Sequence, residues 1–233
     1  MEENKRAPKE YQISKFKNTT ARLVGRYVLT DNFDLYEQGF FGKGMLSRSR
    51  PQQVVEFSLD DDTKEQIREE LLLTLHEAFY LVYALGCLQV THQGKVLTIH
   101  ECFEKFCEME GYEFFLSRYA SYHYFRCRGW IVKSGVKYGC DFMLYRLGPE
   151  LDHSKYCTRI VPIINGQKDE MPWKELQHQS RLSISVAKIL VVTSVRIDTP
   201  NNQDVTTLVK SSTVKQILDC VSIEMIQTTR FMP

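Results

Sequence analysis

The segment from residue 130 to residue 163 constrains the fold most, because three strand-like runs follow one another within it. "WIVKS" and "DFMLY" are short apolar runs, and we expect them to pair as an antiparallel hairpin with Ser134-Gly135 at the turn. "KYCTRIVPI" is a third strand candidate. Alternation along "DFMLY" places Met143 and Tyr145 together on one face of their strand. The sequence therefore predicts a β-sheet at the centre of this half of the chain.

Helical signals surround these strands. Three helix starts are marked by an N-cap side chain followed three residues later by glutamate: Asp62 with Glu65, Thr74 with Glu77, and Thr98 with Glu101. Residues 113–129 predict another helix, closed by glycine, and "SRLSISVAKILVV" predicts a short helix that runs into a strand. "DVTTLVKS" and "VKQILDCVSIEMI" are interpreted as further strands. The expected fold class is α/β of the α+β type, with mixed sheets flanked by helices.

The length of 233 residues favours two domains, each able to bury its own core. Residues 1–20 alternate charge with polarity and lack the apolar core of a secretory signal, so we expect a flexible N-terminal arm. Residues 21–115 are expected to form a mixed α/β domain, because "ARLVGRYVLT" and "QVVEFSL" read as strands ahead of the predicted helices. Residues 116–233 are expected to form the second domain.

The charge balance limits the kind of partner. Lys and Arg total 30 against 29 for Asp and Glu, a formal net charge of +1, so an anion-binding site must be local rather than a property of the whole surface. Apolar residues make up 43%, yet no run of about eighteen apolar residues exists to span a bilayer. We therefore expect a soluble protein without a membrane span.

The cysteine pattern argues against a disulfide framework and against a zinc ribbon. The seven cysteines form an odd number and include no C-x-x-C pair, which favours reduced thiols in an intracellular protein. His100, Cys102 and Cys107 are spaced so that a metal site is conceivable. Because no second ligand pair follows at zinc spacing, we interpret this cluster as a helix with buried small side chains.

Two groups that can move protons lie close together in "DFMLYRLGPELDHSKY". The predicted strand ends in Tyr145, turns through Gly148-Pro149 and returns past His153. In the helix predicted farther along, Arg181 and Lys188 are seven residues apart, which would place two cations on nearly the same face about 10 Å apart along the axis. A solvated polar face is the plain alternative for these two cations.

These stretches, together with "QGFFGKGMLSRSRP", "EAFYLVYALGCL" and "SYHYFRCRGWIVKSGVKYG", resemble the tRNA-splicing endonuclease, which excises introns from precursor tRNA. The likeness is to the catalytic subunit that cuts the 5′ splice site in eukaryotes, and it covers most of residues 21–192. The resemblance implies a C-terminal nuclease domain with a catalytic tyrosine, histidine and lysine. These match Tyr145, His153 and Lys188. Tyr138, in "KYG", is the competing tyrosine and is treated as a packing residue.

Such a triad implies RNA cleavage that needs no metal or other cofactor. The ribose 2′-hydroxyl attacks the phosphate, His153 is the natural general acid, and Lys188 supplies fixed positive charge. Tyr145 acts as a base only if a nearby cation, expected to be Lys188, lowers its pKa; otherwise it orients the 2′-hydroxyl. The expected products are a 2′,3′-cyclic phosphate and a 5′-hydroxyl, and DNA should not be cut.

The resemblance also implies partners. Besides precursor tRNA, they are the other subunits of a heterotetramer with two catalytic and two structural chains, and residence in the nucleus is expected. Arg181 matches an arginine that stacks on the flipped-out nucleotide in the opposite catalytic site. A second stacking partner is expected near the C-terminal strand, where no tryptophan follows Trp173. The loop "RIDTPNNQD" would either dock on a basic partner surface or form an exposed turn.

Two other functions stay open from the sequence. The first is a structural subunit that keeps the fold and binds tRNA or partner subunits without cutting, although such relatives are expected to lack part of the triad. The second is a metal-dependent nuclease, for which Asp141 would need partner carboxylates and a nearby lysine.

Overall fold

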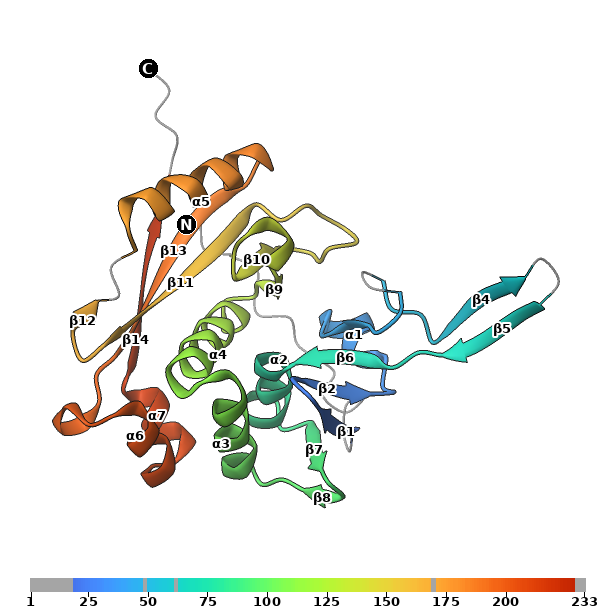
Figure 1. The fold of residues 1–233 in the computed structure, drawn as a ribbon, viewed down its shortest axis with the longest axis horizontal. Coiled ribbons are helices and arrows are strands. Elements are labelled where there is room, and N and C mark those ends of the chain that lie inside the picture. The colour runs from blue at the N-terminus through green and yellow to red at the C-terminus, as the bar shows by residue number, and fades with distance from the viewer. Residues whose placement is uncertain (1–18, 48–49, 61–62, 169–170, 229–233) are drawn as a thin grey trace. The chain divides into compact units, whose positions relative to one another are not determined.

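The computed structural model describes residues 19–47, 50–60, 63–168 and 171–228 (Figure 1). The chain divides between Met109 and Glu110 into two compact units, and each is described by itself. The boundary expected between residues 115 and 116 lies inside helix α4 (Tyr112–Cys127). Of the expected N-terminal arm, residues 1–18 lie outside the described residues, and Thr19 and Thr20 begin the first strand.

The first unit contains a mixed six-stranded sheet in the order β3-β6-β2-β1-β7-β8. Its strands are β1 (Thr19–Val24), β2 (Tyr27–Thr30), β3 (Lys43–Gly44), β6 (Leu71–Thr74), β7 (Leu88–His92) and β8 (Lys95–Val96). A separate hairpin is made by β4 (Val54–Asp60) and β5 (Thr63–Arg68). The helices are α1 (Asp34–Gly39), α2 (Leu75–Phe79), continued by a π-helical turn at Tyr80–Ala84, and α3 (Ile99–Glu110), which reaches the division between the units. The strands predicted in "ARLVGRYVLT" and "QVVEFSL" are confirmed.

Two of the three predicted helix starts are confirmed. At the start of α2, the Thr74 backbone N–H donates to the Glu77 carboxylate at 3.0 Å. At the start of α3, the Thr98 N–H donates to Glu101 at 2.8 Å. The third prediction was wrong, because Glu65 belongs to β5 and Asp62 lies outside the described residues. Pairing with β4 outweighs the local capping signal there.

A buried carboxylate organises the segment that precedes β4. Glu69 is 1% exposed, and its oxygens accept hydrogen bonds from the backbone N–H groups of Leu46, Ser47 and Gln52 and from the Ser47 hydroxyl. Burial alone would raise the pKa of Glu69, but these hydrogen bonds outweigh it and hold the pKa below its ordinary value of 4.5. The ionised form of Glu69 is therefore the form that stabilises this segment.

We expect Glu69→Gln to lower the free energy of unfolding by about 1–3 kcal/mol near neutral pH, because an amide cannot accept all of these hydrogen bonds. Since the folded-state pKa of Glu69 lies below the unfolded-state pKa, the contribution is complete above pH 4.5 and is lost as the pH falls through the folded-state value. Urea unfolding of wild type and variant at several pH values checks this. The exposed Glu56→Gln is the control, and a difference that grows on acidification would contradict the prediction.

The second unit contains a mixed six-stranded sheet in the order β14-β13-β11-β10-β9, with β12 paired to β11. Its strands are β9 (Ile131–Ser134), β10 (Phe142–Tyr145), β11 (Tyr156–Ile164), β12 (Gln167–Lys168), β13 (Ile189–Ile197) and β14 (Val221–Gln227). Only β11 and β13 are parallel; the other pairs are antiparallel. The helices are α4, α5 (Trp173–Ser185), α6 (Val205–Ser211) and α7 (Val214–Asp219).

Helices α4 and α5 cover opposite faces of this sheet. Met143 lies in a buried cluster to which Tyr145 and Leu176 of α5 pack. Phe142, the neighbour of Met143 on β10, instead meets Tyr122 of α4 with the ring centroids 5.9 Å apart. The predicted alternation along "DFMLY" is thus confirmed, and so is the α+β fold class.

The hairpin of β9 and β10 is confirmed, but its connection is longer than the predicted turn. Residues 135–141 join the strands and include a 3-10 turn at Val136–Tyr138. Tyr138 in this turn is 41% exposed, so its interpretation as a packing residue was wrong.

The strand prediction was also wrong for residues 205–219, which form α6 and α7, and right for β14. In α6 the buried residues Val205, Leu208 and Val209 follow helical spacing, and in α7 a capping box joins Thr213 and Gln216. These helical signals outweigh the β-branched composition.

All seven cysteines are free thiols, and the predicted helix around Cys102 and Cys107 is α3, in which both are buried. Within the described part of the chain, no group of three or more His, Cys, Asp or Glu side chains is placed to hold a metal ion. Among the same residues, no helix combines the length and apolar character that a bilayer crossing requires.

Candidate active site

Strand register brings two of the predicted site residues to one edge of the second sheet (Figure 1). This edge is the end of the sheet at which β10 finishes and β11 and β13 begin. Leu144 of β10 pairs with Tyr156 of β11, which pairs with Ile189 of β13. Tyr145 ends β10, and Lys188 immediately precedes β13. Because β10 runs antiparallel to β11 and β13 runs parallel to it, both residues lie at the same edge. Their strands are two spacings apart, about 10 Å.

His153 reaches the same edge through the loop between β10 and β11. A turn at Gly148 shapes this loop, since the N–H groups of Leu151 and Asp152 donate to the Gly148 carbonyl at 3.2 and 3.0 Å. His153 is exposed and stands three residues before the start of β11. The next residue, Ser154, is 4% exposed and hydrogen-bonds to the Tyr145 side chain. The loop that carries His153 is therefore tied to Tyr145.

Lys188 does not lie on a helix, so the predicted two-turn spacing from Arg181 was wrong. Helix α5 ends at Ser185, and Ala187 adopts the left-handed conformation with φ 54°. The Lys188 N–H then donates to the Ser183 carbonyl at 2.8 Å, which closes the helix end. Because no glycine marks this turn in the sequence, the local pattern predicted that the helix continues through Lys188. Arg181 is exposed on α5.

The side chain of Lys188 is half-buried and helps to line a pocket of about 220 Å³. The pocket lies between α5, the start of β13 and the end of β14, and its other lining residues are Ser180, Ser183, Ile184, Ile189, Leu190 and Thr228. Beside the pocket, the Cys157 sulfur lies 3.1 Å from the Ser183 hydroxyl. The hydrogen bond with Cys140 lowers the pKa of Cys157 against the effect of burial, and the charge of Lys188 adds to this lowering. The positive charge of Lys188 therefore acts on the face of the sheet that also carries Tyr145.

Tyr145 is half-buried, and burial raises the pKa of its phenol above the ordinary value of 10. The hydrogen bond to Ser154 opposes this effect, whereas the nearby Tyr138 and Cys140 add to it. The net direction is opposite to the lowering that a phenolate base requires. In the RNA-free chain, Tyr145 is thus a neutral phenol suited to hydrogen bonding.

We accordingly expect Tyr145 to titrate at a pH above 10 in the RNA-free chain. The measurement is the tyrosinate absorbance of wild type minus that of Tyr145→Phe across an alkaline titration. The matched control is Tyr27→Phe, which removes an exposed phenol of the first unit that does not act on Tyr145. A difference curve for Tyr145 with a midpoint near neutral pH would contradict the assignment.

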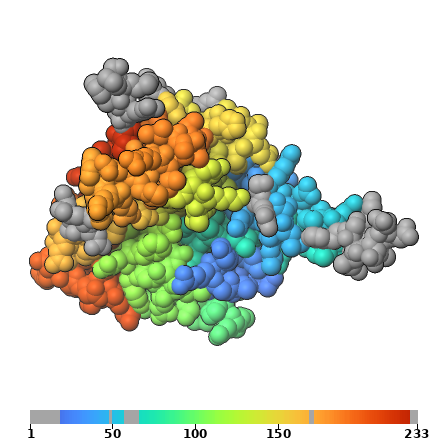
Figure 2. Space-filling view, turned by 45° about the horizontal axis from the view of Figure 1, so that its top comes forward, coloured from blue at the N-terminus to red at the C-terminus, as the bar shows by residue number. Residues whose placement is uncertain are grey.

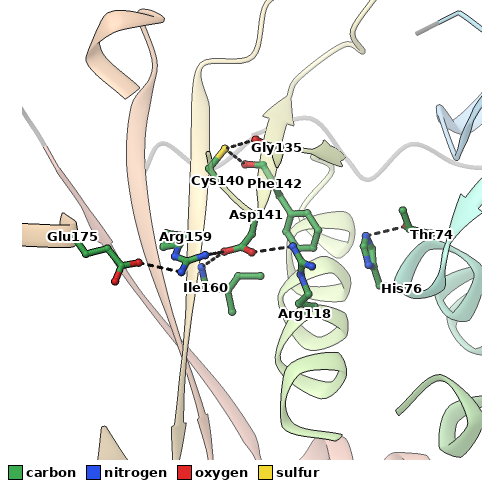
Figure 3. Close-up of polar contacts among 10 residues, drawn as sticks. All are labelled: Thr74, His76, Arg118, Gly135, Cys140, Asp141, Phe142, Arg159, Ile160 and Glu175. Atoms are coloured by element: carbon green, nitrogen blue, oxygen red, sulfur yellow. Dashed lines mark hydrogen bonds and ion pairs between the residues drawn. The ribbon is translucent and has the colours of Figure 1, made fainter. Parts of the chain in front are cut away.

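A partly buried ion-pair network organises the other end of β10 (Figure 3). Asp141 is 7% exposed, and its carboxylate accepts hydrogen bonds from Arg118 of α4 at 2.9 Å and from the Ile160 N–H at 2.8 Å. Arg159 of β11 approaches the same carboxylate at 3.5 Å and donates to Glu175 of α5 at 3.1 Å. The network therefore joins β10 and β11 to the helices on both faces of the sheet.

This environment bears on the metal-dependent alternative, which requires Asp141 as a metal ligand. Both carboxylate oxygens of Asp141 accept from cationic or backbone donors, whereas a metal ligand needs neighbouring oxygen or nitrogen donors to the metal. Sequence reasoning did not identify this network, because Arg118, Arg159 and Glu175 come from three distant segments. The only local signal was a charged residue at the start of an apolar strand.

Comparison with known proteins assigns both units to one family. Residues 20–103 match the family model described as tRNA intron endonuclease, N-terminal domain, and residues 115–207 match tRNA intron endonuclease, catalytic C-terminal domain. The chain is 37% identical over 148 residues to tRNA-splicing endonuclease subunit Sen2 of Rattus norvegicus, covering 61% of this chain and 31% of that protein.

Two other relatives show how widely the likeness extends. The chain is 33% identical over 129 residues to subunit Sen2-1 of Arabidopsis thaliana, covering 55% of this chain and 53% of that protein. It is 35% identical over 179 residues to the tRNA-splicing endonuclease of Saccharolobus islandicus, covering 75% of this chain and 89% of that protein. The chain spans less than a third of the length of the rat and mouse Sen2 proteins. It belongs to the tRNA-splicing endonuclease family and carries both domains of that family.

Proposed function

We propose that this chain is a catalytic subunit of a tRNA-splicing endonuclease and cleaves precursor tRNA at the 5′ splice site. One observation carries the proposal: strand register and the β10–β11 loop bring Tyr145, His153 and Lys188 to a single sheet edge. The choice of the 5′ site rests on the sequence resemblance, and the identity to Sen2 subunits supports a place in the same enzyme.

In the proposed reaction, the ribose 2′-oxygen bonds to phosphorus as the bond from phosphorus to the 5′-oxygen breaks. His153 donates a proton to the departing 5′-oxygen, and the Lys188 ammonium stabilises the negative charge that develops on the phosphoryl oxygens. Tyr145, neutral when no RNA is bound, accepts a hydrogen bond from the 2′-hydroxyl and orients it, and water takes up the 2′ proton. The products are a 2′,3′-cyclic phosphate and a 5′-hydroxyl, without a metal.

The proposal includes a role for Arg181 and for partner subunits. Arg181 is exposed on α5, so its planar guanidinium is accessible for stacking on an unpaired base. As the family resemblance suggests, we place that base in the active site of another catalytic subunit within a heterotetramer. Arg181 would then position RNA for cleavage by its neighbour rather than by its own triad.

The test is cleavage of an intron-containing precursor tRNA in EDTA by the assembled endonuclease, with analysis of the product ends. Cleavage at the 5′ site with a 2′,3′-cyclic phosphate supports the proposal. A matched RNA with a single 2′-deoxynucleotide before the 5′ splice site should not be cut there. Loss of activity in EDTA, or cleavage of the deoxy substrate, would contradict the proposed chemistry.

A further inference from the structure

Two exposed cations, Arg146 and Lys155, flank Tyr145 at the edge of the second sheet. Arg146 directly follows Tyr145. The register that pairs Leu144 with Tyr156 places Lys155 opposite Tyr145 at the start of β11. The Lys155 carbonyl accepts from the Ile189 N–H at 3.0 Å, so the segment is already held in the sheet at this point. Both cations therefore have backbone positions set by the same pairing that assembles the candidate active site.

The side chains of these cations lie near two buried aromatic rings. The Arg146 guanidinium lies 6.0 Å from the centroid of the Trp130 ring, and the Lys155 ammonium lies 5.5 Å from the centroid of the Tyr156 ring. The two rings meet edge to face, 5.6 Å apart, and they are 1% and 2% exposed. Each cation therefore has a weak cation–π contact, at the outer part of the range of about 6 Å for that interaction.

The position of the two cations relative to the active site follows from the faces of the sheet on which their contacting rings lie. Leu144 pairs with Tyr156, and the neighbouring pair is Met143 with Cys157. Because side chains alternate along a strand, Leu144 and Tyr156 point to the face opposite that of Met143, Tyr145 and Cys157. Trp130 contacts Tyr156 and lies on this opposite face. The Arg146 guanidinium near Trp130 and the Lys155 ammonium near Tyr156 therefore extend the positive charge of Lys188 from the α5 face of the sheet towards the α4 face.

The cations of this edge stand at the ends of three neighbouring strands, a spread that suits an extended polyanion rather than a single small anion. Arg146, Lys155 and Lys188 contribute three positive charges, and Glu150 and Asp152 of the same loop contribute two negative charges, which leaves a local excess of one. The loop is at the surface beside α5, as the yellow and orange regions of Figure 2 show. A flexible nucleic-acid strand that crosses the edge can place successive phosphates near separate cations.

We propose that Arg146 and Lys155 form a subsite for backbone phosphates of the RNA next to the scissile phosphate. The subsite rests on the proposed function, because it requires RNA at this edge. Contacts to phosphates fix the position of the strand and carry no base preference. Loss of the two cations should therefore weaken RNA binding and raise KM, and leave kcat at saturating RNA unchanged.

The experiment measures binding of the uncleavable 2′-deoxy precursor tRNA by the assembled endonuclease at several salt concentrations. Each lost phosphate contact reduces the slope of log affinity against log salt by about 0.7, so the variant Arg146→Gln with Lys155→Gln should lose about 1.4. The control is Lys210→Gln on α6, which follows the opposite end of β13 and should keep the wild-type slope. The charge-retaining pair Arg146→Lys with Lys155→Arg should also keep it.

The outcomes separate the subsite from the proposed function. A wild-type slope in the double Gln variant overturns the subsite and leaves the proposed function standing. If wild-type protein neither binds nor cuts the precursor, both fail. If the double Gln variant unfolds, the same measurement is made on Lys155→Gln alone. One lost phosphate contact should reduce its slope by about 0.7, and a wild-type slope would overturn the subsite. A lowered kcat with unchanged binding would also overturn the subsite.

Discussion

Replacing His153 with alanine is expected to abolish cleavage at the 5′ splice site by the assembled endonuclease and to leave the other cut intact. His153 is the exposed imidazole of the loop tied to Tyr145, and the proposed reaction needs a proton for the departing 5′-oxygen. Loss of a positioned general acid lowers the rate by about 10²–10⁴-fold. Single-turnover cleavage, with both cut sites followed separately, measures the effect.

The matched control for this variant is His178→Ala. His178 is also exposed, but it lies on the solvent side of α5, and its loss should leave both cuts at the wild-type rate. His153→Ala should still bind the uncleavable precursor as wild type does, since the proposed role of the imidazole is chemical. A 5′ cut that stays within a few fold of wild type would make this chain a structural subunit.

Replacing Asp141 with alanine is expected to lower the free energy of unfolding by about 3–5 kcal/mol. The change leaves Arg118 without its 2.9 Å carboxylate contact and deprives the buried Ile160 N–H of its acceptor. Asp141 is 7% exposed, so water cannot easily replace the lost partner. Urea unfolding of the full chain, followed by circular dichroism, measures the loss.

Two variants show whether the network causes this loss. Asp219→Ala removes an exposed carboxylate at the end of α7 and should change the unfolding free energy by less than about 0.5 kcal/mol. Asp141→Asn keeps a carbonyl acceptor for one donor, so its loss should fall between those of the alanine variant and wild type. An Asp141→Ala loss as small as that of Asp219→Ala would contradict the stabilising role of the network.

The sequence predicts the centre of the second sheet well because the information there is local. Alternation in "DFMLY" places Tyr145 on the same face as Met143, and the hairpin with β9 follows from two short apolar runs. The capping boxes at Thr74 and Thr98 likewise need only four residues to be recognised. Family resemblance then identified the residues that the register brings to one edge.

What the sequence could not predict depends on long-range or unusual backbone features. Lys188 leaves the helix because Ala187 takes a left-handed conformation that alanine rarely adopts. The direction of the Tyr145 pKa shift depends on burial and on Ser154, which no spacing rule identifies. The Asp141 network joins segments separated by up to 57 residues, from Arg118 to Glu175. Such features become visible only when the strands are placed side by side.

The most direct test of the central claim replaces the departing 5′-oxygen at the 5′ splice site of the precursor with sulfur. A thiolate leaves without needing a proton, so a general acid is no longer required. If His153 is that acid, the endonuclease carrying His153→Ala should cleave the sulfur substrate nearly as fast as wild type does. If His153→Ala remains as impaired on the sulfur substrate as on the oxygen substrate, His153 is not the acid and the proposed active site is wrong.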